Sequence, residues 1–294
     1  MIRKDMIEIN NIEELKNKIF NEDCISENLN EGMNRIPDKS IDMILCDLPY
    51  QKTEMSWDTI IPFNKLWKQY ERIIKDNGAI ILFGNQPFTS MLIMSNLKLF
   101  KYCLVWNKEI CGSFAMAKLR PMIIHEDICV FSKGTTANGS KRNMIYNPIL
   151  KDAEEKNIRP VNQGSSFSNA TFGERSSQRM AKSDKNYNPK KRYPKSIFTY
   201  SKYNAECNQL KRLHSTQKPV ELLKWLISMY SNENNIILDN CCGSGSTAIA
   251  SINTNRNYIL FDNGKCDKKG DNYSRYWADI SQERINTYLE NKIL

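Results

Sequence analysis

Histidine is scarce in this chain of 294 residues, which contains only two, and its nine cysteines include no Cys-x-x-Cys pair. A structural metal site draws on Cys and His ligands at regular spacing, so we expect no bound metal. Nine is an odd number of cysteines, and a disulfide scaffold is normally a much shorter chain. The cysteines are therefore interpreted as reduced thiols, which is typical of a cytoplasmic protein.

Long apolar runs are missing as well. No stretch approaches the ~18 consecutive apolar residues that a membrane-spanning helix needs. The charged start Met1–Met6 is followed by no apolar segment of signal-peptide length. We therefore expect a soluble protein of the cytoplasm with no membrane partner. Its length suits one large α/β domain with an inserted region, or two small domains.

Positive charge is concentrated in one region. Lys and Arg outnumber Asp and Glu by 42 to 33, and residues 134–212 alone hold sixteen basic and six acidic residues. This interval also lacks apolar periodicity and has aromatic residues spaced among the charges. Such a composition is typical of a surface that contacts the phosphates and bases of a nucleic acid. On charge alone, a solvated loop that keeps the protein soluble explains it equally well.

Apolar runs of strand length alternate with helical patterns elsewhere in the chain. Continuous apolar runs are expected of parallel strands covered on both faces, and the alternation indicates a doubly wound α/β fold. The predicted strands are residues 41–46, 79–84, 102–106, 128–131, 236–238 and 258–261. The predicted helices are residues 12–20, 28–34, 63–74, 87–97, 219–230 and 247–250, with a closing helix in the tail from about Tyr273.

Asp47-Leu48-Pro49-Tyr50 follows the first of these strands. The Asp47 carboxylate and the Pro49 carbonyl are two hydrogen-bond acceptors beside the flat ring of Tyr50. That combination suits a planar ligand with an amino group, since the ring can stack on a heterocycle while the acceptors hold its exocyclic nitrogen. A simple turn at the end of a strand explains the same four residues.

A second strand end carries the glycine-containing loop Asp239-Asn240-Cys241-Cys242-Gly243-Ser244-Gly245, followed by a helical pattern. Glycines let a ligand approach the backbone, and a helix N-terminus offers free N–H groups, so the loop predicts a nucleotide-type site. The third glycine of the dinucleotide pattern is missing, which argues against NAD. Asp262 ends the next apolar run, where an acidic residue would bind ribose hydroxyls. The predicted cofactor is an adenosine without a diphosphate.

These two stretches, with His214-Ser215-Thr216-Gln217-Lys218-Pro219 between them, resemble the amino-methyltransferases of DNA that use S-adenosylmethionine. The catalytic Asp-Pro-Pro-Tyr-like motif precedes the Gly-x-Gly motif, which is the order of the beta group of that family. The resemblance covers most of the chain, from about Asp23 to the C-terminus. It implies a Rossmann-like methyltransferase sheet that is mostly parallel with one antiparallel strand.

The resemblance also implies roles for single residues. The catalytic pocket would be formed by Asp47, Pro49 and Tyr50, with Asp262 on the ribose of the cofactor. The full set of implied cofactor-binding residues is Asp23, Asp47, Thr216, Lys218, Asp239, Cys241, Gly243, Ser244, Gly245 and Asp262. Thr216 and Lys218 would lie near the methionine end, and for Asp23 a helix cap is an equal alternative.

Two positions depart from the family pattern. Leu48 stands where the family usually has a first proline, but that position supplies no hydrogen-bonding group, so little chemical loss is expected. Asp262 replaces the commoner glutamate, one methylene longer, and residues 263–271 read as an insertion. Both departures suggest an alternative, a DNA-binding relative that has lost activity.

The resemblance also divides the chain. Residues 1–133 would form the catalytic half of the methyltransferase domain, residues 134–212 an inserted target-recognition region, and residues 213–294 the cofactor-binding half. The expected partner is double-stranded DNA, whose target base must be swung out of the duplex. Residues 51–61 are expected to form a loop that closes over the base. A single chain and a homodimer both remain open.

The predicted reaction moves a methyl group from S-adenosylmethionine to the exocyclic N6 of a flipped-out adenine. Asp47 favours adenine, because the family's cytosine members usually carry serine at this position. Methylation of the cytosine ring needs a cysteine nucleophile in a Pro-Cys dipeptide, which the sequence lacks. Methylation of cytosine N4 in DNA and of adenine in RNA remain as alternatives.

Overall fold

The computed structural model divides the chain into two compact units. One is formed by Met1–Asn147 with Ser196–Leu294, and the other by Pro148–Lys195. Both predicted strand-end motifs belong to the larger unit. The structure describes residues 11–50, 59–109, 111, 114–154, 188, 190–201, 213, 217–266 and 272–293.

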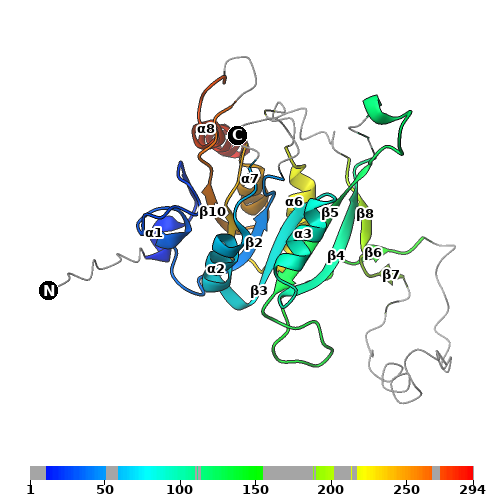
Figure 1. Ribbon diagram of the computed structural model, residues 1–294. Helices are drawn as coiled ribbons and strands as arrows, with labels where there is room; N and C mark the ends of the chain where they lie inside the picture. The colour runs from blue at the N-terminus through cyan, green and yellow to red at the C-terminus, as the bar shows by residue number, and fades with distance from the viewer. Residues whose placement is uncertain are drawn as a thin grey trace. The chain divides into compact units, whose positions relative to one another are not determined.

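The larger unit is built on an eight-stranded sheet with the strand order β1-β10-β9-β2-β3-β5-β4-β8 (Figure 1). β5 runs antiparallel to its neighbours β3 and β4, whereas the other neighbouring strands pair in parallel. This confirms the predicted doubly wound sheet, mostly parallel with one antiparallel strand. The strands are β1 (Lys18–Phe20), β2 (Ile41–Cys46), β3 (Ile74–Gly84), β4 (Phe100–Asn107), β5 (His125–Ser132), β8 (Ile197–Thr199), β9 (Ile236–Asp239) and β10 (Asn257–Phe261).

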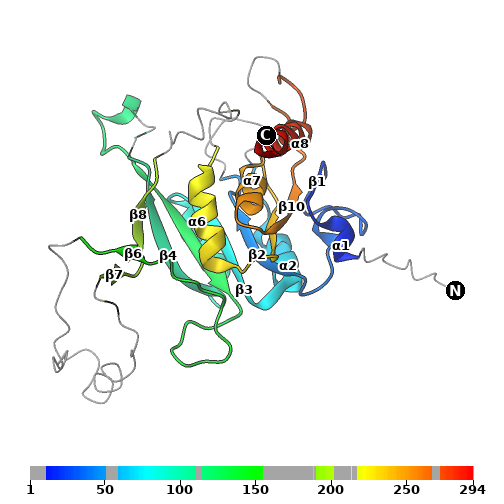
Figure 2. The same cartoon turned by 180° about the vertical axis from the view of Figure 1, so that it is seen from behind.

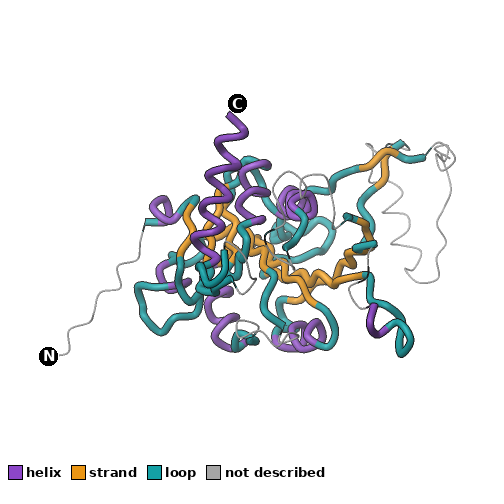
Figure 3. Tube along the Cα trace, turned by 90° about the horizontal axis from the view of Figure 1, so that it is seen from above, coloured by secondary structure: helices purple, strands orange, loops and turns teal. Residues whose placement is uncertain are grey.

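Helices cover both faces of this sheet (Figure 3). One face carries α2 (Phe63–Ile73) and α3 (Phe88–Ser95), and the other carries α6 (Val220–Tyr230) and α7 (Ser246–Asn253), as Figure 2 shows from behind. α8 (Trp277–Ile293) packs against α7 and β1. Because both faces are covered, every residue of β2 is buried, including Asp42 among its apolar neighbours. None of the described helices is long and apolar enough to cross a membrane.

β2 and β9 are neighbours, and this pairing brings the two predicted motifs together. Ile44 of β2 lies opposite Leu238 of β9. At the start of the pair, Asp42 is buried and accepts a hydrogen bond from the Ile236 N–H at 2.9 Å. The same carboxylate accepts from Lys75 Nζ at 2.6 Å. These contacts set the register in which both strands end at one edge of the sheet.

The prediction of an N-terminal helix is wrong beyond Leu15. α1 spans Ile12–Leu15, Asn17 adopts a left-handed backbone with φ of 59°, and β1 follows at the edge of the sheet. Phe20 pairs with Phe261 of β10, a tertiary contact that the local spacing does not contain.

The helix predicted at residues 28–34 is also wrong. A single 3-10 turn, η1 (Gly32–Arg35), takes its place. Gly32 has φ of 56°, and a Cβ atom there would lie 2.2 Å from the Asp23 carbonyl oxygen. Only glycine suits this position, because both the backbone conformation and the space forbid a side chain.

The smaller unit contains a short antiparallel pair, β6 (Lys151–Asp152) with β7 (Lys191–Arg192). Lys191 Nζ lies 2.7 Å from Asp152 Oδ1 across this pair. Residues from 196 onward belong to the larger unit, where β8 adds to β4 at the sheet edge. The sequence analysis missed β8, because three residues are too few for a periodic pattern. From the sequence, the Ser-rich residues 163–177 could be either ordered or mobile without DNA, and they lie outside the described part of the chain.

Candidate active site and cofactor pocket

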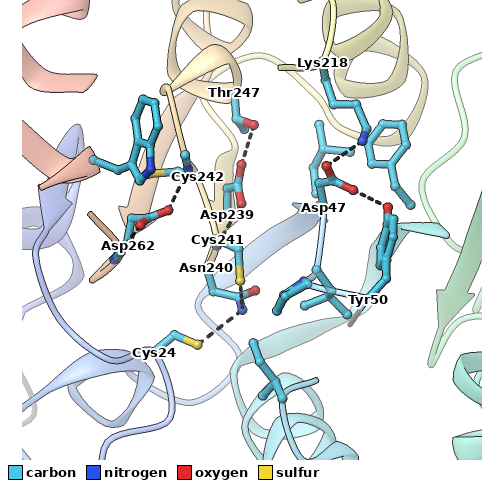
Figure 4. Close-up of a pocket in the computed structure, with 18 of the residues that line it drawn as sticks. Cys24, Asp47, Tyr50, Lys218, Asp239, Asn240, Cys241, Cys242, Thr247 and Asp262 are labelled. Atoms are coloured by element: carbon cyan, nitrogen blue, oxygen red, sulfur yellow. Dashed lines mark hydrogen bonds and ion pairs between the residues drawn. The ribbon is translucent and has the colours of Figure 1, made fainter. Parts of the chain in front are cut away.

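A cavity of about 630 Å³ opens where β2 and β9 end. We call its side at Asp47 the base end and its side at the glycine-containing loop the cofactor end (Figure 4). The described predicted residues that line it are Asp23, Asp47, Pro49, Tyr50, Lys218, Asp239, Cys241, Gly243, Ser244 and Asp262. The two predicted motifs therefore face one common cavity. Its volume lies in the range of about 300 to 1,000 Å³ that is usual for small-molecule sites.

At the base end, side chains bind both oxygens of the Asp47 carboxylate. Lys218 Nζ lies 2.5 Å from Oδ2, and the Tyr50 hydroxyl donates a hydrogen bond to Oδ1. Burial and the charge of Asp47 raise the pKa of Tyr50 well above its usual value, so its hydroxyl stays protonated and remains a donor. The Tyr50 ring also packs on Phe88, with 4.9 Å between ring centroids. The carboxylate therefore has a fixed orientation toward the cavity.

Lys218 bridges Asp47 to a second carboxylate, that of Glu126 on β5. Its ammonium lies 3.2 Å from Glu126 Oε2, while Lys108 Nζ lies 3.0 Å from Glu126 Oε1. Burial favours the neutral form of Glu126, but Lys218 and Lys108 outweigh it and hold the pKa of Glu126 well below its usual range. Burial opposes the charge of Lys218 as well, yet Asp47 and Glu126 raise its pKa. Glu126 and Lys218 are therefore both charged at neutral pH.

The contact between Lys218 and Asp47 adds to what the sequence analysis expected of this lysine. The resemblance implied a place near the methionine end, and the structure brings the ammonium to the base end. The sequence analysis did not place Glu126 or Lys108 in the site. The sequence indicates only that Lys108 and Glu126 lie near the ends of strands. It does not indicate that residues 108, 126 and 218 come together in the fold.

At the cofactor end, Asp239 is buried beneath the loop. Its Oδ2 accepts a hydrogen bond from Thr247 Oγ1 at 2.6 Å, and its Oδ1 accepts from the Cys241 N–H at 3.1 Å. Burial is the main reason that the pKa of Asp239 rises to about 6. A buried carboxylate beside an open cavity suits a cationic or hydrogen-bond-donating ligand.

The two loop glycines serve different purposes. Gly243 has φ of 49° and lines the cavity, and a Cβ atom there would meet nothing within 4 Å. Gly245 has φ of 73° and caps α7, and its Cβ would come within 3.0 Å of Ser281 Cβ on α8. Gly243 therefore leaves room for a ligand, whereas Gly245, which is not among the lining residues, lets the loop pack against α8.

Asp262 supports the loop as well as lining the cavity. Its Oδ2 accepts a hydrogen bond from the Gly243 N–H at 2.7 Å, and its Oδ1 accepts from the Gly264 N–H at 2.9 Å. Burial raises its pKa. Asp23 also lines the cavity, and its Oδ1 accepts from the Ile25 N–H at 3.0 Å, so it is a local cap at the cavity wall.

Several supporting residues escaped the sequence analysis. Asn240 is buried, accepts a hydrogen bond from the Tyr70 hydroxyl at 2.5 Å and donates to Cys24 Sγ at 3.4 Å. From α8, Arg284 Nη1 donates to the Ser244 carbonyl at 2.7 Å. These contacts join segments far apart in the sequence, so no local pattern predicts them.

Some of the predicted site residues lie outside the described part of the chain. These are Thr216, with its neighbours His214 and Ser215, and residues 51–58 of the expected closing loop. Among the described residues, no group of three or more His, Cys, Asp or Glu side chains could hold a metal ion.

A doubly wound sheet whose neighbouring strand ends join an acidic, aromatic pocket to a Gly-x-Gly loop defines a Rossmann-like methyltransferase. Comparison with known proteins identifies the family. The model of the DNA methylase family, whose members act on N6 or N4 amino groups, matches residues 41–277. The chain belongs to this family, and its cofactor is S-adenosylmethionine.

The relatives share about a quarter of their residues with this chain, and the matches cover most of both chains. The chain is 25% identical to Type II methyltransferase M1.MboII of Moraxella bovis, over 92% of this chain and 98% of that protein. It is 25% identical to DNA adenine methyltransferase YhdJ of Escherichia coli K12, over 77% of this chain and 73% of that one. The crystal structure of the M1.HpyAVI-SAM complex superposes with a TM-score of 0.54 at 19% identity, covering 92% of this chain and 98% of that chain. That likeness concerns the fold.

Proposed function

We propose that this protein methylates the exocyclic N6 of adenine in double-stranded DNA. The observation that carries the proposal is the common cavity, in which Asp47 at one strand end faces the glycine-containing loop at the next. A methyl donor held at the loop and a base held at Asp47 would have their reacting atoms in one enclosed space. Bound S-adenosylmethionine supplies an electrophilic methyl group on a sulfonium, which is already a good leaving group.

The residues at the base end suit an amino group. The lone pair of an exocyclic amine is delocalised into the ring, so the amine is a poor nucleophile until its geometry changes. Asp47 would accept one N–H and the Pro49 carbonyl the other. Each carboxylate oxygen has two acceptor positions, so Asp47 can accept this bond while Lys218 and Tyr50 keep theirs. Positioning and charge then provide the catalysis.

Lys218 would hold the Asp47 carboxylate in place and balance its negative charge. Its ammonium lies on the carboxylate and is itself held by Glu126. An ionised Asp47 can disperse the positive charge that develops on the amine and receive its proton late. In this account Glu126 and Lys108 are positioning residues, because they act through Lys218.

At the cofactor end, the proposed contacts follow from the lining residues. Gly243 and Ser244 would approach the methionine part with their backbone, and Asp262 would accept hydrogen bonds from the ribose. Asp239 and Cys241 would border the cavity beside the sulfonium, and Asp23 would line the cavity as well. Thr216 is proposed near the methionine end from its place in the motif.

Adenine is preferred over cytosine for two reasons. Asp47 stands where the family's cytosine members usually carry serine, and the relative YhdJ is named as an adenine methyltransferase. Cytosine N4 remains the alternative target, and loss of activity is the alternative to catalysis. The basic interval at residues 134–212 is proposed to read the DNA sequence.

One experiment separates these readings. The protein is incubated with methyl-labelled S-adenosylmethionine and plasmid DNA, and the DNA is hydrolysed to nucleosides. Label in N6-methyladenine supports the proposal, and label in N4-methylcytosine replaces it by the alternative. Cofactor binding without label in DNA supports the inactive relative. DNA from cells that express the protein is then sequenced with direct detection of modified bases. This identifies the recognition sequence that is methylated.

A further inference from the structure

The loop between β4 and β5 has exposed apolar side chains. We define the β4–β5 loop as residues 114–124, which begin with the 3-10 turn η2 (Phe114–Met116). Phe114 is 80% exposed and Leu119 is 78% exposed, the two highest values among the large apolar residues that the structure describes. Water surrounds both side chains in the isolated protein, so an apolar contact elsewhere would stabilise them.

The β4–β5 loop projects from the rim of the active-site cavity. β2, β3 and β4 run in one direction, because β5 is antiparallel to both β3 and β4. β4 therefore ends at the same edge of the sheet as β2, where Asp47 lies. The loop extends beyond this edge in Figures 1 and 2, in green.

The base of the β4–β5 loop is part of the cavity wall. Trp106 and Glu126 face each other across the β4–β5 ladder, and both line the cavity. Just above them, the Lys108 N–H donates to the Ile124 carbonyl at 2.8 Å and closes the hairpin. The β4–β5 loop therefore continues directly from residues of the cavity wall.

The charges on the β4–β5 loop favour a polyanion over an apolar protein surface. Lys118 and Arg120 flank Leu119 and are exposed. No acidic residue occurs between positions 110 and 125 in the sequence. Exposed apolar side chains close in sequence to cations fit DNA, whose stacked bases lie between two phosphate backbones.

We propose that Phe114 and Leu119 enter the duplex beside the target base and occupy the gap that its extrusion leaves. Lys118 and Arg120 contact the flanking phosphates. Extrusion breaks pairing and stacking, which costs a few kcal/mol, and apolar side chains placed between base steps offset part of this cost. This inference rests on the proposed function, and it adds the element that holds the base out.

The test compares two double variants on two duplexes. Phe114→Ala with Leu119→Ala removes both tips. Met94→Ala with Leu97→Ala is the matched control, because those residues are 68% and 56% exposed and lie in and just after α3. One duplex contains the unmethylated recognition sequence identified by sequencing, and the other has a mismatched base opposite the target adenine. Single-turnover methyl transfer and S-adenosylmethionine binding are measured for each protein.

We expect the loop variant to transfer at least about tenfold more slowly to the matched duplex and within about threefold of wild type on the mismatched one. A mismatched base is already poorly paired, so it depends less on the loop. Cofactor affinity and the control variant should stay within about twofold of wild type.

Four results overturn the inference. An unimpaired loop variant, or equal losses on both duplexes, rejects it while leaving the proposed function intact. Loss of a dimer in sedimentation of the loop variant assigns the loop to a contact between chains instead. A wild-type protein that transfers no methyl group overturns the proposed function and this inference together.

Discussion

At the cofactor end of the cavity, Asp239 and Asp262 accept hydrogen bonds from backbone N–H groups of the loop beside them. At the base end, Asp47 is bound by side chains instead, one of which comes from residue 218. The carboxylates of the cofactor end are thus held by N–H groups 2 and 19 positions away from them. The ion pairs of the base end join β2, β5 and the residue two positions before α6. The base end therefore depends on side chains from more distant parts of the chain than the carboxylates of the cofactor end do.

Removing the Asp47 carboxylate separates the two ends most strongly. We expect Asp47→Ala to slow methyl transfer by roughly a thousandfold, because the acceptor for the amine is lost. Cofactor affinity should change by less than about threefold, since the loop contacts remain. Labelled transfer and calorimetric cofactor binding measure the two effects.

The control for this variant is Asp76→Asn. That carboxylate is 69% exposed and pairs with Lys39 at 2.9 Å on the surface. It should leave both transfer and binding unchanged. A parallel loss of transfer and cofactor binding in Asp47→Ala would show that Asp47 does not belong to the base end alone.

Lys218→Met tests the ion pairs of the base end. Without the ammonium, Asp47 loses the partner of its Oδ2 atom, and its orientation is no longer fixed. We expect methyl transfer to fall by about a hundredfold, because catalysis depends on the exact position of the acceptor. Single-turnover rates measure this.

The matched control is Lys39→Met, which removes a surface lysine that also pairs with an aspartate. Its transfer rate should equal that of wild type. A Lys218→Met variant that transfers as fast as wild type would contradict the assigned role, because Asp47 would then not need the lysine to hold it in place.

Glu126→Gln changes the stability of the fold as well as the position of Lys218. The folded pKa of Glu126 is depressed, so its contribution is present above its unfolded pKa of about 4.3 and is lost as the pH falls below that value. We expect a loss of about 2 kcal/mol in unfolding free energy at pH 7. The difference from wild type should narrow below about pH 4.

Urea unfolding at several pH values measures this difference. The control is Glu221→Gln, which removes a partner of Lys224 within one turn of α6 at a contact of 2.6 Å. Its effect should be a few tenths of a kcal/mol at every pH above 5. An equally small effect of Glu126→Gln would mean that the buried pairs do not stabilise the fold.

The two loop glycines give the smallest and sharpest contrast. Gly245→Ala should lower the unfolding free energy by about 2 kcal/mol, because a left-handed backbone and the Ser281 contact both oppose a Cβ atom. Gly243→Ala meets open space and should cost about 1 kcal/mol. Its main effect should be weaker cofactor binding. Thermal unfolding with and without cofactor distinguishes them, and the reverse order of effects would contradict the assigned purposes.

The same contrast explains what the sequence could predict. The central strands, the strand-end motifs and Asp262 were found because apolar runs and glycine patterns are local. The local spacing of apolar residues predicts a helix over residues 12–20 and so misses β1. β1 forms because it pairs with β10, whose residues lie more than 200 positions away. The links of Lys218 to Asp47 and Glu126, and of Tyr70 to Asn240, were missed for the same reason. Local sequence patterns therefore predict where the site lies, but they do not predict which side chains from distant segments contact it.

A crystal structure with S-adenosylhomocysteine, the product of the proposed reaction, tests the central claim most directly. We predict that the ribose of the product binds at Asp262 and its amino acid part at the Gly243 loop. Its sulfur should face Asp47 across the cavity. A product bound outside this cavity, or with its adenine against Asp47, would contradict the account.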